Sequence, residues 1–268
     1  MAEAVVIWIA SNAGGVGKTT LSIHIGYRLA QHGVKTLLVD LDTNGSLARF
    51  CGLESPIDAE QTSAALFSRQ FNGNYPVAFP TWKQAAPEKF GLCLGGDIMV
   101  SVALDLPART GREYVLQKTF KKFPPPAEVI LLDSPASLDV LSYCALAAAT
   151  HILIPSPMSI KISGVDSLLQ MIRSESEELN LIPPPQILGG VPMKVAKNAD
   201  QQMFATEIKD IFEDQDVHCF PAIRENKHFE NAANRGIAPL YLYRPGNEAC
   251  KDFEPIVDAI QSLLNKKN

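Results

Sequence analysis

A glycine-rich segment near the start of the chain, residues 11–20 (SNAGGVGKTT), constrains the fold more than any other feature of the sequence. It follows an apolar run over 4–10 and precedes a helical pattern over 18–33. A buried strand, a tight turn and a helix are therefore expected in direct succession. Backbone amides in such a turn converge with the amino end of the helix and favour a bound phosphate. The segment predicts a phosphate-binding loop.

The residue types of this loop suit a nucleotide triphosphate and its metal. Glycines let successive N–H groups turn toward phosphate oxygens, Lys18 is placed to reach the β- and γ-phosphates, and the Thr19 hydroxyl is placed to ligate Mg²⁺. Asn12 replaces the first glycine of the usual pattern, and asparagine is among the residues that best tolerate positive φ. An ordinary strand-to-helix turn is the alternative. The predicted nucleotide-binding residues of the loop are Gly14, Gly15, Val16, Gly17, Lys18, Thr19 and Thr20.

Three aspartates follow apolar runs that are expected to be strands. Asp40 and Asp42 lie at the end of one run (LLVDLD), and Asp133 ends another (VILLD). The carboxyl ends of parallel strands collect ligands at one edge of a sheet, so all three should lie beside the loop. We predict Asp40 and Asp133 as nucleotide and metal ligands together with Thr19, and Asp42 as the group that orients an attacking water. Helix capping is the alternative for any one of them alone.

Apolar, β-branched runs alternate with amphipathic stretches along the chain, which predicts an α/β fold. We expect a doubly wound, mostly parallel sheet with helices on both faces, in a single domain over 1–268. Helices are expected over 18–33 and 163–180, and the pattern is weakest over 52–88. The expected strands are 4–10, 35–40, 90–96, 128–133, 151–156, 186–192 and 217–223.

Composition narrows the class of protein. The chain has 268 residues, 46% of them hydrophobic, and a net charge of −5, which argues against a surface that binds nucleic acid all over but allows a local basic patch. Five cysteines without a C-x-x-C motif are expected to be reduced thiols in a cytoplasmic protein. The opening residues lack a basic leader, and no apolar run approaches the ~18–20 residues of a membrane helix.

Four segments together resemble the ParA/MinD family of deviant Walker A ATPases: GGVGKTT, LLVDLDTNGSLARF, VILLDSPASLD and FPAIRENKHFENAANRGIAPL. The resemblance extends from about residue 4 to the end of the chain and is weakest over 52–126. It implies a homodimer that sandwiches Mg²⁺ and ATP at its interface. It also implies ATP hydrolysis that stays slow until a partner protein stimulates it. Thr43, Asn44 and Gly45 replace the Pro-Gln-Gly usual in the family, a mild departure.

A lysine that the family carries before its Gly-Gly pair is missing, because that position holds Ala13. In the family this lysine reaches across the dimer to the partner's phosphates. The best substitute in the sequence is Lys161, in a loop after the fifth expected strand, and we predict it as a catalytic residue beside Lys18 and Asp42. An ordinary solvated lysine is the alternative. The loop NAGGVGKTT resembles the McdA-type ATPases, which position carboxysomes and also lack the family lysine.

Family members bind DNA without sequence preference through basic residues on the dimer face. By resemblance we predict Lys194, Lys197, Arg224 and Lys227 as DNA-binding residues, with Arg235, Lys251, Lys266 and Lys267 as an extension of the patch. Such binding should weaken steeply with salt. The alternative is that these residues are scattered, solvated charges. Because the net charge is −5, two copies of the chain would have to combine their weak basic patches to bind DNA with useful affinity.

The resemblance implies a nucleoid-associated ATPase that positions a carboxysome-type cargo with a McdB- or ParB-like adaptor. A plasmid or chromosome partition ParA is the nearest alternative, and a MinD-like membrane-bound ATPase is the second. The last helix (FEPIVDAIQSLLNKKN) has lysines only at its tip, so it is expected to dock on the core, without stable membrane binding. An enzyme of the ligase type that shares this loop is a further alternative, and it would use a pocket for a small-molecule substrate.

Overall fold

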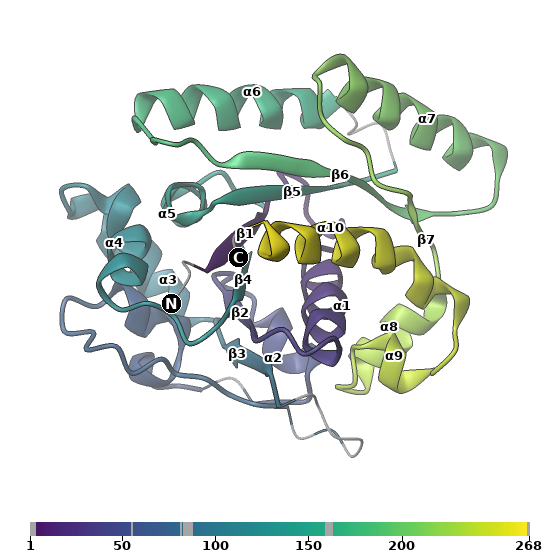
Figure 1. Ribbon diagram of the computed structural model, residues 1–268. Coiled ribbons are helices and arrows are strands. Elements are labelled where there is room, and N and C mark those ends of the chain that lie inside the picture. The colour runs from purple at the N-terminus through teal and green to yellow at the C-terminus, as the bar shows by residue number, and fades with distance from the viewer. Residues whose placement is uncertain (1–3, 55, 81, 83–87, 159–162, 267–268) are drawn as a thin grey trace.

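The apolar run before the glycine loop forms β1 (Val5–Ile9), the central strand of a seven-stranded sheet (Figure 1). The computed structural model describes residues 4–54, 56–80, 82, 88–158 and 163–266. All five residues of β1 are buried, as expected for a strand covered on both faces. It pairs in parallel with β4 on one side and β5 on the other.

The strand order is β3-β2-β4-β1-β5-β6-β7, and every pair of neighbouring strands runs parallel. β2 and β3 lie on one side of β1, β4 returns to the place between β2 and β1, and β5, β6 and β7 extend on the other side, so the sheet is doubly wound, as predicted. In such sheets the point where the direction changes is the usual ligand site. The remaining strands are β2 (Thr36–Asp40), β3 (Phe90–Cys93), β4 (Val129–Asp133), β5 (His151–Ser156), β6 (Gln186–Val195) and β7 (Ile223–Arg224).

Helices cover both faces of the sheet and enclose two separate cores. Side chains of β1 alternate between them, with Ile7 in one core and Trp8 in the other. One layer holds α1 (Lys18–Gln31), α2 (Ser46–Phe50), α8 (Lys227–Asn234), α9 (Leu240–Tyr243) and α10 (Glu254–Asn265). The other holds α3 (Ile98–Asp105), α4 (Val115–Lys122), α5 (Val140–Ala148), α6 (Ser163–Glu178) and α7 (Ala199–Asp214).

The last predicted strand, 217–223, is wrong over most of its length. Only Ile223 belongs to a strand, and Cys219 makes an isolated bridge to Gly190. Pro221 has no N–H to donate to a ladder, which explains why pairing breaks there. The weakly patterned stretch 52–88 contains the short 3₁₀ helices Ala59–Gln61 and Ser63–Phe67, so part of it is helical.

The final helix, α10, packs on the core as predicted. Ile256, Val257 and Ile260 are buried against the layer that contains α1. The ion pair between Arg28 and Glu254, with Nε and Oε1 2.8 Å apart, adds a polar link between the two helices. Among the residues that the structure describes, no helix combines the length and apolar character needed to cross a membrane.

Candidate phosphate loop and carboxylate site

The turn after β1 has the backbone conformation that a phosphate-binding loop requires. Gly15 (φ 71°) and Gly17 (φ 107°) adopt the left-handed region, which residues with a Cβ rarely adopt. Gly17 is the residue immediately before α1, so the free amides at the start of α1 face the turn. Strand, glycine turn and helix therefore follow one another as the sequence predicts.

Asn12 uses its side chain and not an unusual backbone. It is absent from the described non-glycine residues with positive φ, so the explanation we expected for its place in the loop is wrong. Its Nδ2 instead donates a hydrogen bond of 2.8 Å to the carbonyl oxygen of Gly164, at the start of α6. A Cβ on Gly164 would lie 3.1 Å from that nitrogen, so the contact is close. Ala13 is buried, and its backbone N–H donates to the Ser11 hydroxyl at 3.2 Å.

Two of the predicted carboxylates face each other across neighbouring strands. Asp40 and Asp133 are paired in the register of β2 and β4, and each is only 1% exposed. Within the described part of the chain, three of their buried oxygens have no hydrogen-bond partner: Oδ2 of Asp40 and both oxygens of Asp133. Buried charges are normally paired or bind metals. Burial raises the pKa of Asp133 to about 6 and that of Asp40 well above its usual value, the latter helped by Asp133.

Lys18 and Thr19 reach this pair of carboxylates from the start of α1. Burial lowers the pKa of Lys18, while the charges of Asp133 and Asp42 act in the opposite direction. Thr19 is near enough for its hydroxyl to lower the pKa of Asp133, although that contact falls short of standard hydrogen-bond geometry. One buried ammonium group thus faces several acidic groups. The remaining oxygens suit a divalent cation.

Mg²⁺ fits this donor set. In nucleotide sites it typically binds one or two carboxylates together with phosphates and waters. Among the described residues, no group of three or more His, Cys, Asp or Glu side chains could hold a metal ion. The chain would therefore offer Mg²⁺ the Thr19 hydroxyl with Asp40 and Asp133, and the nucleotide would complete the shell.

Asp42 lies at the surface side of the carboxylates. Its Oδ1 accepts hydrogen bonds from the backbone N–H and the side-chain Nδ2 of Asn44, at 2.9 and 2.8 Å. Its own N–H donates to Oδ1 of Asp40 at 2.9 Å. Gly95 packs against the same turn, where a Cβ would come within 2.8 Å of the Asp40 carbonyl oxygen. The turn after β2 is therefore fixed by close contacts, with one Asp42 oxygen left to face solvent or ligand.

A buried hydrogen bond connects the segment after Asp133 to β1. The indole Nε1 of Trp8 donates to the Ser134 hydroxyl at 2.8 Å, and both residues are almost fully buried. Trp8 also packs in the core beneath α5. The backbone that follows the Asp133 carboxylate is thus tied to the strand that leads into the glycine loop.

A cavity of about 360 Å³ lies between the glycine loop and the end of β6. The loop contributes residues 13–16, and the other wall includes Met193, Lys194 and Glu225. The Nζ of Lys194 donates a hydrogen bond of 2.6 Å to the carbonyl oxygen of Gly15. The sequence placed Lys194 among DNA-binding residues and missed this contact. No local pattern signals it, because the two residues are 179 positions apart.

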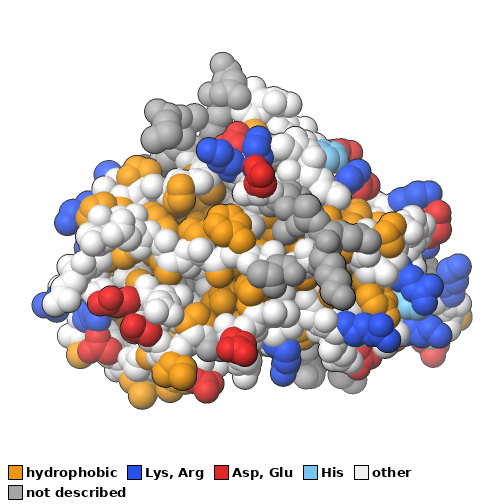
Figure 2. Space-filling view, turned by 90° about the horizontal axis from the view of Figure 1, so that it is seen from below, with side chains coloured by type: hydrophobic (Ala, Val, Ile, Leu, Met, Phe, Trp, Pro, Cys, Tyr) orange, Lys and Arg blue, Asp and Glu red, His pale blue; other side chains and the backbone are white. Residues whose placement is uncertain are grey.

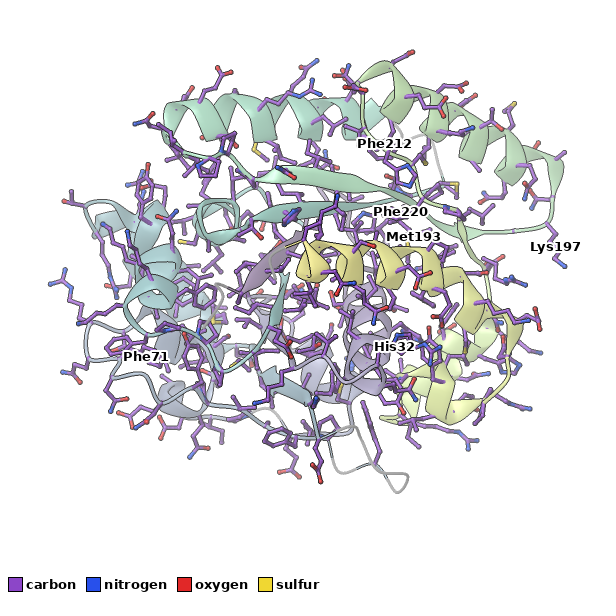
Figure 3. All side chains as sticks on the ribbon, in the orientation of Figure 1. His32, Phe71, Met193, Lys197, Phe212 and Phe220 are labelled. Atoms are coloured by element: carbon purple, nitrogen blue, oxygen red, sulfur yellow. The ribbon has the colours of Figure 1, made fainter. Side chains whose placement is uncertain are left out.

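The other predicted DNA-binding residues are spread along the β6–β7 edge. Lys197 is exposed at the outer edge of the molecule (Figure 3). Arg224 forms two side-chain hydrogen bonds to Asp252, at 2.8 and 2.7 Å. Lys227 is the first residue of α8. Lys161, the predicted substitute for the family lysine, lies outside the described residues.

Basic side chains gather at the right-hand side of the molecule in Figure 2, the side on which Figure 1 places α8 and α9. Of the residues expected to extend the patch, Arg235 lies over the ring of Tyr243, and Lys251 pairs with Glu248 at 2.9 Å. Lys266 follows the end of α10, and Lys267 lies outside the described residues. Several of these cations therefore already have partners within the chain.

Comparison with known proteins identifies relatives of the same architecture. A family model described as an AAA domain matches residues 4–182. The cell division protein PomZ of Myxococcus xanthus is 27% identical over 94% of this chain and 76% of its own length. The maintenance of carboxysome distribution protein A of Gloeothece citriformis is 27% identical over 94% of this chain and 95% of its own length. The Cyanothece McdA–ATP complex superposes with a TM-score of 0.83, 24% identity and coverage of 97% and 98% of the two chains.

Proposed function

The chain belongs to the AAA-domain family of ParA/MinD-type ATPases, and from that premise we propose that it is an ATP-dependent positioning ATPase. In this proposal ATP closes a homodimer, the dimer binds DNA without sequence preference, and an adaptor protein triggers hydrolysis and release. The observation that carries it is the set of buried, unpartnered carboxylate oxygens of Asp40 and Asp133 beside the glycine loop. A divalent cation would satisfy these oxygens, and Mg²⁺ accompanies ATP.

Each predicted site residue then has a role. The amides of Gly14 to Thr20 hold the phosphates, and Lys18 neutralises charge that grows on the β- and γ-phosphates. Thr19, Asp40 and Asp133 would hold Mg²⁺, which would supply neutralisation of phosphate charge. Asp42 has a free oxygen to orient a water toward the γ-phosphate. Phosphoryl transfer needs little more than this, because positioning and electrostatic stabilisation provide most of its catalysis.

The chain has Ala13 where the family carries a lysine that reaches the partner's phosphates in the dimer. We propose that Lys161 provides the cation that the family lysine normally brings, since Ala13 cannot. The dimer would combine two weak basic patches that include Lys197 and Lys227, and the counterions released on DNA binding would make affinity strongly dependent on salt.

The cargo is proposed from the relatives. Similarity to a carboxysome distribution protein and to PomZ supports a positioning role, with a McdB- or ParB-like adaptor and a place on the nucleoid. Plasmid or chromosome partition by a ParA-like mechanism is the alternative, since the same cycle of ATP-dependent DNA binding would serve it. A MinD-like membrane role is the second alternative.

The decisive experiment measures DNA binding by the purified chain with ATP, with ADP and without nucleotide. We expect binding with Mg²⁺ and ATP only, together with a shift from monomer to dimer in light scattering. Lys161→Ala should lose ATP-driven dimerisation, whereas Lys121→Ala, in the last turn of α4, is the charge-matched control. Equal DNA binding in all three nucleotide states would overturn the proposed function. Flotation with anionic vesicles would detect the MinD-like alternative.

A further inference from the structure

Lys194 lies at an irregular point of β6. Its φ of 59° is in the left-handed region, which a residue with a long side chain rarely adopts. The register between β6 and β7 shifts at the same place, between Met193 and Val195. Bulges of this kind redirect a side chain. Here Met193 and Val195 are buried, while the Lys194 side chain lies across the glycine loop.

The contact with the loop is close and specific. Nζ of Lys194 donates to the carbonyl oxygen of Gly15 at 2.6 Å, the short distance typical of charge-assisted hydrogen bonds. A Cβ on Gly17 would lie 3.1 Å from Cε of Met193 and 3.9 Å from Cε of Lys194. The end of β6 therefore packs directly over the loop, and it does so in the space that the missing Cβ of Gly17 leaves.

This hydrogen bond fixes the orientation of one peptide unit. The Gly15 carbonyl and the Val16 N–H belong to the same trans peptide, in which C=O and N–H point in opposite directions. Gly15 gives this unit freedom to rotate on one side, and apart from the glycine itself and its chain neighbours no described atom lies within 4 Å of its Cβ position. By holding the carbonyl from the β6 side, the ammonium group directs the Val16 N–H away from it, as an anion-binding turn requires.

We propose that Lys194 is a positioning residue of the phosphate loop: it holds the Gly15–Val16 peptide in the phosphate-binding orientation and adds a positive charge from the same chain. The inference rests on the proposed function, since it needs the loop to bind nucleotide. It also gives a reason for the strained backbone at 194, which a solvated lysine would not need. The predicted DNA contact of Lys194 becomes an alternative that the test must distinguish.

The test is titration calorimetry of ATP and ADP with the full chain and three variants. Lys194→Gly removes the amine but suits the left-handed backbone, so the nucleotide-free variant should unfold at the same or a higher temperature. Its affinity for both nucleotides should fall about 5- to 20-fold, as expected for loss of a charge-assisted hydrogen bond. Lys194→Arg should recover most of that loss. Lys209→Ala, which removes an exposed lysine from α7, should bind like the wild type.

Ionic strength separates positioning by charge from simple packing. The difference between wild type and Lys194→Gly should shrink at high salt, because screening weakens an exposed charge. Equal ATP affinity of these two proteins would overturn the inference, and so would an arginine variant as weak as the glycine one. If Lys194→Gly lost DNA binding but kept its ATP affinity, the inference would be wrong and Lys194 would be a DNA-binding residue. A wild-type chain without ATP affinity would overturn the proposed function as well.

Discussion

The two flanks of the glycine loop differ in how their charged groups find partners. On the carboxylate flank, made by Asp40, Asp42 and Asp133, buried oxygens of two residues have no partner within the described chain. On the β6 flank, made by Met193, Lys194 and Glu225, the exposed ammonium group is already bonded to the Gly15 carbonyl. In our proposal the carboxylate flank binds the metal, and the β6 flank fixes the orientation of the loop backbone.

The two flanks are expected to contribute differently to the stability of the folded chain. A buried carboxylate without a hydrogen-bond partner destabilises the folded chain. A hydrogen bond between exposed or half-buried groups stabilises modestly, by about 1 kcal/mol. Substitutions on the carboxylate flank should therefore change activity most. Substitutions that remove contacts within the chain should change stability or nucleotide binding, by smaller amounts.

The largest effect should come from Asp133→Asn. We expect ATP hydrolysis to fall about 100- to 1000-fold, the range seen when one electrostatic group of an active site is removed. The nucleotide-free variant should melt close to the wild-type temperature, because relief from burying a carboxylate is offset by the loss of an acidic neighbour of the buried Lys18. Steady-state phosphate release and differential scanning calorimetry measure the two properties.

Asp139→Ala is the matched control for that variant. The Asp139 carboxylate caps α5 and accepts hydrogen bonds from the N–H groups of Leu141 and Ser142. Its loss should lower the free energy of unfolding by about 1 kcal/mol and leave hydrolysis almost unchanged. Equal decreases in the free energy of unfolding of Asp133→Asn and Asp139→Ala would contradict the expected difference between the two carboxylates.

His24 provides a buried titratable group that has partners on both sides. Its Nδ1 is 2.6 Å from the carbonyl oxygen of Thr20, and its Nε2 accepts from the N–H of Leu240, so the neutral ring is the bonded form. Burial lowers its pKa to about 4. The folded state therefore holds the proton more weakly than the unfolded state. Stability from this group is present above pH 6.5 and is lost as pH falls toward 4, by roughly 3 kcal/mol.

Urea denaturation of wild type and His24→Asn at several pH values measures this loss. The variant is expected to start less stable at pH 7 and to show a flatter dependence between pH 6.5 and 4. Identical slopes for the two proteins would mean that His24 is not the group that titrates.

Gly95→Ala should distort the carboxylate flank. Its Cβ would lie 2.8 Å from the carbonyl oxygen and 2.9 Å from Cγ of Asp40. We expect about 1–3 kcal/mol less stability, as in other overpacked sites, measured by chemical denaturation. Gly14→Ala is the comparison, because its Cβ meets open space, and its stability should change by less than about 0.5 kcal/mol. A similar loss at both positions would contradict a tight flank beside an open loop.

The smallest effect should follow from Asn12→Ala, which removes the hydrogen bond to the Gly164 carbonyl. Since Asn12 is exposed, we expect about 0.5–1 kcal/mol less stability by thermal denaturation. Asn12→Gly restores the usual residue of such loops and should lose as much or slightly more. A full restoration of stability by glycine would show that the backbone, and not the amide, decides the residue at this position.

The sequence predicted the parts of this molecule that depend on local pattern. β1, the glycine turn and α1 follow from residues adjacent in the chain, and Asp40 and Asp133 follow from the rule that parallel strands end at one edge. The Lys194 contact could not be predicted, because it depends on a left-handed lysine and a bulge in β6. The link from Asn12 to α6 was missed because it joins residues 152 positions apart. Pro221 is visible in the sequence and was overlooked as a break in the last expected strand.

The hydrogen bond from Trp8 to Ser134 makes Trp8 an intrinsic fluorescent probe of the segment after Asp133. The chain has two tryptophans, and Trp82 donates instead to the Gly236 carbonyl on the α8 side. A displacement of the segment after Asp133 is expected to change the surroundings of the Trp8 indole. Emission from a Trp82→Phe variant would therefore report on changes at the carboxylate flank in real time, without an added dye.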